Sequence, residues 1–307
     1  MIDSPPNTVA RTRAGRGLRR CLRAAAAALL LVLAGCSVKH TTKIQVPAKK
    51  AAARTANLDE LLAQLDAYAT KVRALSCSSV RLSYTSVKAD AGKLEQYRSA
   101  PGYILLRRPD QLRLTIQNPV TKTSIAELAS NGDAFSLWLP RDNKLYTGRN
   151  SARALAVEGG PSFGARPIHI FEAIAFTKGS EAGALVALAE DSDAVANYYV
   201  VEVFRQSGPS RLRPVRRIWF ERSTMTVSSQ KTFAPDGSIS SVISYSNFTP
   251  VDGIQLPLQI KLERPSDGYT LTMEFKAWRL NPEIPGNAFV LTPPATAQKV
   301  ELREKAD

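Results

Sequence analysis

After residue 77 the chain alternates apolar and polar residues, which is the spacing of β-strands with one covered face. The alternation is clearest in Leu112–Gln117, Ala134–Leu139, Leu258–Glu263 and Leu271–Ala277. Turn signals such as Asn131-Gly132 and Asp252-Gly253 separate such segments. About ten antiparallel strands in regular succession are therefore expected.

A helical spacing precedes the strands. Apolar residues recur three or four positions apart from Leu58 to Leu75, and Asn57 and Glu60 match a capping box. Two more helices are expected at 167–177 and 180–189. The predicted fold class is α+β, a large curved antiparallel sheet or unclosed β-barrel with helices as a lid on one side.

The N-terminus has the order of a secretory signal. Six arginines lie between Arg11 and Arg23, and an apolar run of about 11 residues follows, which is short of the roughly 20 needed to span a bilayer. Leu33-Ala34-Gly35-Cys36 comes next and resembles the lipobox of bacterial lipoproteins. The resemblance implies cleavage before Cys36 and acylation of that residue. We therefore expect a signal peptide over 1–35, a flexible tether over 36–56 and one lipid-binding half-barrel domain over 57–307.

The charge of the chain is concentrated at its N-terminus. The net charge is +14, but the first 54 residues hold 11 of the 41 Lys and Arg and only one of the 27 Asp and Glu. The remaining chain is nearly balanced, so binding to nucleic acid is not expected. With Cys21 removed and Cys36 acylated, Cys77 is the remaining thiol and is expected to be buried.

Catalytic and metal-binding patterns are weak. Gly160–Gly164 matches G-x-S-x-G, but the body of the chain has one histidine, His169, only seven residues beyond Ser162. Three cysteines and two histidines in all do not make a typical zinc site. No cofactor, metal or enzymatic activity is expected, with an esterase using Ser162 as the remaining alternative.

Several segments resemble the bacterial lipoprotein-localisation family. Gly102–Pro109, Leu137–Pro140 and Phe289–Pro294 resemble its periplasmic carrier, the LolA-like branch. Arg113–Val120 and Leu256–Trp278 resemble its outer-membrane receptor, the LolB-like branch. The lipobox favours the receptor, because the carrier is soluble. The resemblance implies an unclosed barrel with a helical lid over an apolar cavity that binds acyl chains.

The same resemblance implies roles for individual residues. Arg108 matches the carrier's arginine that joins the lid to the sheet, and Val120 aligns with the receptor's exposed leucine that helps insert lipoproteins into the membrane. Ser37 after the acylated cysteine favours the outer membrane. The expected acyl-contacting residues are the apolar inner-face positions Leu105, Leu114, Ile116, Phe135, Leu137, Leu139, Leu258, Ile260, Leu271, Met273 and Phe275.

The predicted function is that of a lipid-anchored, periplasm-facing protein that accepts or transfers lipoproteins at the outer membrane. Its expected partners are the membrane, through the N-terminal acyl chains, lipoprotein or phospholipid acyl chains as ligand, and a periplasmic carrier protein. Two alternatives stay open. One is an envelope sensor or protein-binding module on the same scaffold, and the other is a structural lipoprotein whose interior is filled by its own side chains.

Overall fold

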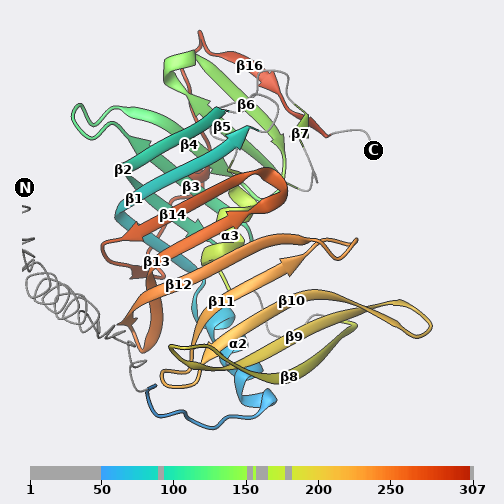
Figure 1. Cartoon of the computed structure of the whole chain (residues 1–307). Helices are drawn as coiled ribbons and strands as arrows, with labels where there is room; N and C mark the ends of the chain where they lie inside the picture. Colours follow the sequence, from blue (N-terminus) through green and yellow to red (C-terminus); the bar gives the residue numbers. More distant parts are fainter. Residues whose placement is uncertain (1–49, 89–92, 151–154, 157–164, 177–181, 305–307) are drawn as a thin grey trace, which may run out of the picture. The chain divides into compact units, whose positions relative to one another are not determined.

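The alternating segments pair into one long, strongly curved sheet (Figure 1). The computed structural model describes residues 50–88, 93–150, 155–156, 165–176 and 182–304. Its strands are β1 (Ala74–Lys88), β2 (Lys93–Arg107), β3 (Gln111–Gln117), β4 (Ser124–Ser130), β5 (Ala134–Leu139), β6 (Lys144–Arg149), β7 (Leu155–Ala156), β8 (Ala184–Ser192), β9 (Asn197–Gly208), β10 (Arg211–Glu221), β11 (Thr226–Phe233), β12 (Ile239–Val251), β13 (Ile254–Arg264), β14 (Tyr269–Phe275), β15 (Arg279–Leu280), β16 (Gln298–Glu301) and β17 (Arg303–Glu304).

The main sheet has the strand order β16-β6-β5-β4-β3-β2-β1-β14-β13-β12-β11-β10-β9-β8, with β15 paired to β1. Its two end strands, β16 and β8, do not pair with each other among the described strands, so the barrel is unclosed. Every neighbouring pair in this order is antiparallel except β16 with β6, which is parallel. The expected fold class is confirmed, and the one parallel pair makes the sheet mixed.

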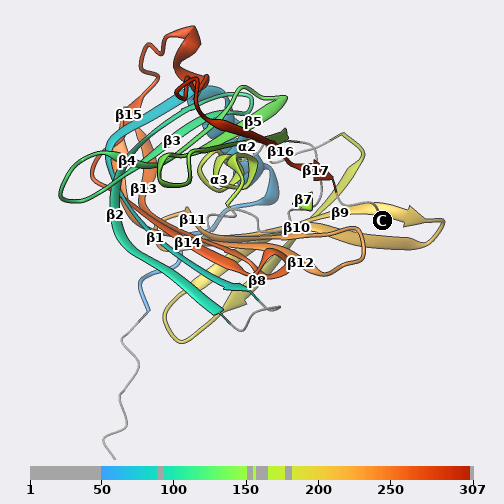
Figure 2. The ribbon, with the colours of Figure 1, turned by 90° about the horizontal axis from the view of Figure 1, so that it is seen from above.

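Two α-helices lie in the hollow of the curved sheet (Figure 2). Helix α2 spans Leu58–Lys71 and α3 spans Pro167–Ile174. The predicted capping box of α2 is present, since the Asn57 side chain accepts from the Glu60 backbone N–H and the Glu60 carboxylate accepts from the Asn57 N–H. Short 3-10 helices occupy Pro140–Asp142, Pro265–Asp267 and Gly286–Phe289.

The hairpin between β12 and β13 shows how a local turn signal fixes register. Asp252 and Gly253 both have positive φ, 47° and 77°, as a two-residue hairpin turn of type I′ requires. The turn pairs Val251 with Ile254. It thereby sets the alternation of β13, which places Ile260 and Leu262 on the buried face.

The expected third helix at 180–189 is wrong, because strand β8 occupies most of that range. Val186 and Leu188 pack against the core cluster, whereas Leu185 is exposed. The Ala-rich composition favours a helix, but β8 pairs with β9 along its whole length, and this pairing decides the structure. Cys77 is free and buried, as expected.

The described end of the expected flexible tether is attached to the sheet. The Arg54 N–H donates to the Arg222 carbonyl at 2.8 Å, and Arg222 Nε donates to the Arg54 carbonyl at 3.2 Å. The Ala56 N–H donates to the Tyr199 hydroxyl at 3.3 Å. The segment that enters α2 is thus hydrogen-bonded to β9 and to the β10–β11 turn.

Candidate functional site

The inner face of the sheet, meaning the face that contacts α2 and α3, is apolar over much of its width. Nine of the expected acyl-contacting residues join one buried hydrophobic cluster with Leu61 and Leu65 of α2. Register brings residues from distant parts of the chain together, since Met273 lies opposite Ile260 on one side and Leu82 on the other. The nine are Leu114, Ile116, Phe135, Leu137, Leu139, Ile260, Leu271, Met273 and Phe275. Their contact with lipid stays a prediction.

The other two expected positions are not members of this buried cluster. Leu105 pairs with Arg113 and Ser76 on the outer face, because Ile104 and Leu106 take the inner positions of β2. The prediction that Leu105 faces the interior is therefore wrong. The apolar residues around Leu105 do not alternate with polar ones, so the sequence does not indicate which face of the sheet each residue occupies. Leu258 is partly buried and packs against the edge of the cluster.

Aromatic side chains join α2 to α3 and to the sheet. The Tyr68 hydroxyl of α2 donates to the Ile174 carbonyl at the end of α3, at 3.2 Å. The Tyr68 ring meets Phe176 edge-on with centroids 4.7 Å apart, and Phe176 lies 4.7 Å from the ring of Tyr245 on β12. Burial raises the pKa of Tyr68 above its ordinary value, so its hydroxyl stays protonated and can donate. The sequence analysis missed this cluster.

Arg108 connects the ends of both helices to the sheet. It follows β2 directly, and its Nε donates to the carbonyl of Val72, the C-cap residue of α2, at 2.8 Å. Its Nη2 donates to the carbonyl of Phe176, just beyond α3, at 2.9 Å. Partial burial lowers the pKa of Arg108, although a guanidinium remains charged in proteins. Carbonyls at helix C-termini lack partners within the helix, and a cation satisfies them well.

A small apolar pocket lies at the edge of α2. Its volume is about 230 Å³ and it opens between α2 and strands β11, β12 and β13. Its apolar lining comes mainly from Leu65, Tyr68, Phe176, Val227, Phe248 and Ile254. Ligand pockets are typically roughly 300 to 1,000 Å³. This pocket alone is therefore too small for a complete acyl chain while α2 lies on the sheet, the arrangement called the closed state below.

Val120 lies at the tip of the β3–β4 loop and is 85% exposed. The loop is well defined, because the Asn118 side-chain oxygen accepts from the N–H groups of Val120 and Thr121 at 2.8 and 3.1 Å. A further backbone bond joins Asn118 N–H to the Thr123 carbonyl. The structure thus presents an apolar side chain to solvent on a short, hydrogen-bonded loop.

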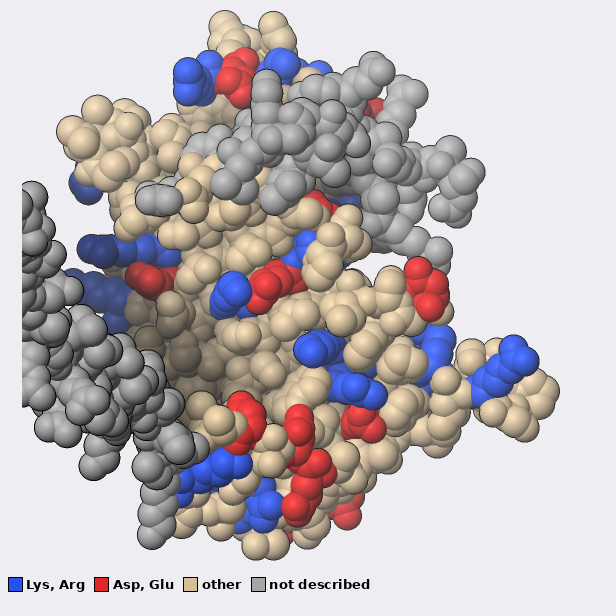
Figure 3. Space-filling view, viewed as in Figure 1, with Lys and Arg blue, Asp and Glu red and all other residues tan. Residues whose placement is uncertain are grey.

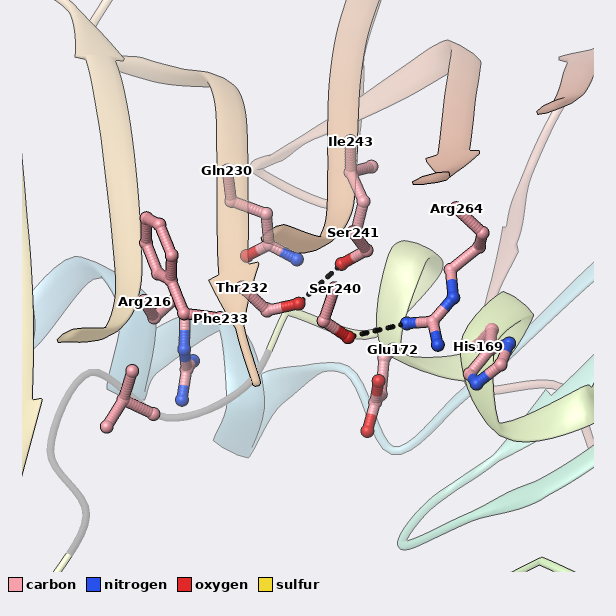
Figure 4. A pocket seen from close by; sticks show the side chains of 11 residues that line it. His169, Glu172, Arg216, Gln230, Thr232, Phe233, Ser240, Ser241, Ile243 and Arg264 are labelled. Carbon is pink, nitrogen blue, oxygen red and sulfur yellow. Dashed lines mark hydrogen bonds between the residues drawn. The ribbon is translucent and has the colours of Figure 1, made fainter. Parts of the chain in front are cut away.

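A second, polar pocket of about 280 Å³ lies on the inner face between α3 and strands β10 to β13. Figure 4 shows its side chains, of which Gln230, Thr232, Ser240, Ser241 and Arg264 point into one space. Thr232 and Ser241 hydrogen-bond through their hydroxyls at 2.6 Å, and Arg264 Nη1 donates to Ser240 Oγ at 2.9 Å. His169, Glu172 and Arg216 complete the polar lining. The sequence analysis did not identify this pocket.

His169 is a neutral residue of this region. Burial, together with Arg264 and Arg166, lowers the pKa of its imidazole to about 2. Its Nδ1 lies 2.9 Å from the Tyr269 hydroxyl and 3.8 Å from Asp267 Oδ2. That carboxylate is already bonded to Arg264 Nε at 2.7 Å, so it does not retain a proton on the histidine.

The neutral state of His169 makes stability depend on pH. Below the unfolded pKa of about 6.5, the unfolded chain takes up a proton that the folded chain excludes, so the free energy of unfolding falls as the pH falls. The loss is expected to approach about 1.4 kcal/mol per pH unit. Urea unfolding at pH 7.0 and 5.5 should show it, and His169→Gln should remove most of the difference. An unchanged pH dependence in that variant would contradict the assignment.

The surface charges and the remaining motifs of the chain add no catalytic or metal-binding group in the described ranges. On the face seen in Figure 3, acidic and basic residues are interspersed. In the described ranges, no group of three or more His, Cys, Asp or Glu is placed to bind a metal ion. A search of the same ranges finds no helix with the length and apolar character to cross a bilayer. Cys36, the signal peptide, Ser37 and the Gly160–Gly164 motif with Ser162 lie outside the described residues.

Comparisons with known proteins give a likeness of fold. No protein-family model and no curated protein sequence matches the chain. A DUF1329 family protein from Desulfovibrio piger superposes with a TM-score of 0.50 at 13% identity, covering 76% of this chain and 95% of that one. A LolA superfamily protein from Nitrosomonas europaea gives 0.46 at 14% identity, covering 77% and 99%. A protein domain from Vibrio parahaemolyticus, described as an outer membrane lipoprotein-sorting domain, superposes with a TM-score of 0.47 at 12% identity. The match covers 76% of this chain and 97% of that one. At these identities the Desulfovibrio piger structure shows a shared fold and nothing more.

Proposed function

We propose that this chain is a lipid-anchored protein of the cell envelope that binds acyl chains between its sheet and α2, and that it accepts or transfers lipoproteins at the outer membrane. The observation that carries the proposal is the apolar inner face covered by helices whose ends are joined to the sheet through Arg108. Such a cover can be displaced as a unit. Binding requires no bond chemistry.

The energetics favour hydrocarbon as the ligand. Burial of apolar surface contributes about 0.8 kcal/mol per CH₂, so a 16-carbon chain leaving water gains on the order of 10 kcal/mol before costs. Moving α2 exposes Leu61 and Leu65, which are fully buried in the closed state. A ligand that replaces these contacts with its own CH₂ groups offsets that cost. In this proposal the tail enters through the apolar pocket beside Leu65.

In this proposal, Cys36 anchors the protein and the loop that carries Val120 delivers the ligand. Acyl chains on Cys36 anchor the protein, and Ser37 directs it to the outer membrane. Val120, exposed on its hydrogen-bonded loop, inserts into the membrane during delivery. A periplasmic carrier supplies the lipoprotein. The chain between the anchor and α2 is hydrogen-bonded to the sheet at Arg54 and Ala56, so the anchor holds the sheet as well as the lid.

Fluorescent fatty-acid uptake by the purified full chain tests acyl binding. A saturable rise in fluorescence that unlabelled palmitate displaces is expected. No uptake would favour the structural alternative. Depletion in cells tests the transfer role. Other lipoproteins should then accumulate in the periplasm or inner membrane, whereas a mainly transcriptional response would favour the sensor.

A further inference from the structure

The polar pocket on the inner face is lined by an amide that no residue of the described ranges hydrogen-bonds. Gln230 of β11 is only 4% exposed, and no hydrogen bond of its carboxamide is found in the described part of the chain. Figure 4 shows this carboxamide directed into the pocket beside the Thr232 and Ser241 hydroxyls. A carboxamide that faces a pocket is satisfied there by water or by a bound molecule. The pocket therefore offers its polar groups to a polar ligand.

The charges of the lining select the kind of ligand. Arg216 and Arg264 are 5% and 9% exposed, whereas Glu172, the one carboxylate of the lining, is exposed at the rim. The salt bridge of Arg264 to Asp267 uses its Nε, and its Nη1 faces Ser240 inside the pocket. Neutral His169 adds no charge. Guanidinium, amide and hydroxyl donors around one space suit an oxyanion with several acceptor oxygens.

We propose that this pocket binds a phosphate ester, with the phosphate oxygens accepting from Arg264, Gln230 and the Ser and Thr hydroxyls, and with Arg216 supplying further positive charge. The rest of the ligand then extends toward the rim of the pocket. The volume of about 280 Å³ admits a phosphate with a small polar substituent.

The polar pocket adjoins the apolar inner face of the sheet. Ile243 of β12 lines the polar pocket and belongs to the apolar cluster, so the two surfaces adjoin. A phospholipid would place its headgroup phosphate in this pocket and its tails along the inner face. For a phospholipid ligand, the inference rests on the proposed acyl-binding function. A free phosphate ester would use the same donors without the tails.

Isothermal titration of the full chain in detergent tests the site. The probes are glycerol 3-phosphate and inorganic phosphate for the free ester, and dihexanoyl-phosphatidylglycerol for the headgroup. Binding of either kind supports the phosphate site and identifies the source. Gln230→Leu should weaken binding about tenfold, since it removes one hydrogen bond to a charged group. Gln230→Glu should abolish phosphate binding, because a glutamate side chain has nearly the same shape as glutamine but carries a negative charge.

Matched changes at Gln206, an exposed residue of β9 outside the pocket lining, should leave binding unchanged. Glycerol and dihexanoylglycerol are the uncharged controls. The inference fails if no phosphate probe binds, if Gln230→Glu binds like the unaltered protein, or if glycerol binds as well as its phosphate. Fatty-acid uptake measured on the same samples keeps the two proposals apart. Fatty-acid uptake without phosphate binding would contradict only the phosphate site. Phosphate binding without fatty-acid uptake would contradict only the acyl-binding function.

Discussion

Replacing Arg108 by leucine is expected to loosen both helices from the sheet. The change removes two charge-assisted hydrogen bonds and leaves the carbonyls of Val72 and Phe176 without this donor. Together these losses should lower the free energy of unfolding by about 2 to 4 kcal/mol, as urea unfolding would show. Acyl binding should strengthen by at least about tenfold, because the variant populates the displaced state of α2 more often.

Arg107→Leu is the matched control for this change. Arg107 is the neighbouring residue of β2, but its Nε donates to Gln111 and its Nη1 to the Ile284 carbonyl, away from both helices. It should alter fatty-acid affinity little, whatever its effect on stability. Equal affinities in the Arg108 variant and the unaltered protein would contradict the role of Arg108 in closing the lid.

Replacing Cys36 by serine is expected to transfer almost the whole population from the membrane to the soluble fraction. A serine hydroxyl offers no thiol for lipid attachment, and each acyl CH₂ in the bilayer is worth about 0.8 kcal/mol of anchoring. Fractionation by ultracentrifugation with immunoblotting measures the change. The mass of the intact protein would show the loss of the acyl chains.

Cys77→Ser serves as the control, because Cys77 is buried in the sheet and distant in sequence from the lipobox. It should stay with the membrane. A Cys36→Ser variant that still sediments with membranes would disprove acyl anchoring at this residue.

Local signals explain which parts of the fold were predictable. The capping box at Asn57 and the turn at Asp252-Gly253 act within a few residues, so sequence alone located α2 and the β12–β13 hairpin. Strand β8 was missed because its composition favours a helix, and only pairing with β9 makes it extended. Leu105 was assigned to the wrong face of β2, because an unbroken apolar run does not indicate which residues face inward.

The polar pocket depends on long-range packing. It joins α3 to four strands, and no local pattern links His169 with Gln230 or Arg264. One signal was available, since Gln230 and Thr232 occupy alternate positions of β11, where the alternation would otherwise call for apolar residues. Arg108 was found by resemblance, but its two carbonyl acceptors come from segments that only the fold brings together.

Photo-crosslinking tests most directly whether hydrocarbon occupies the space beneath α2. The purified full chain is irradiated with a photoreactive fatty acid, and the adducts are mapped by peptide mass spectrometry. Adducts are expected on inner-face residues such as Leu65, Ile260 and Met273, and excess palmitate should reduce them. Adducts confined to exposed positions such as Val120 and Leu185, with none on the inner face, would contradict acyl binding beneath α2.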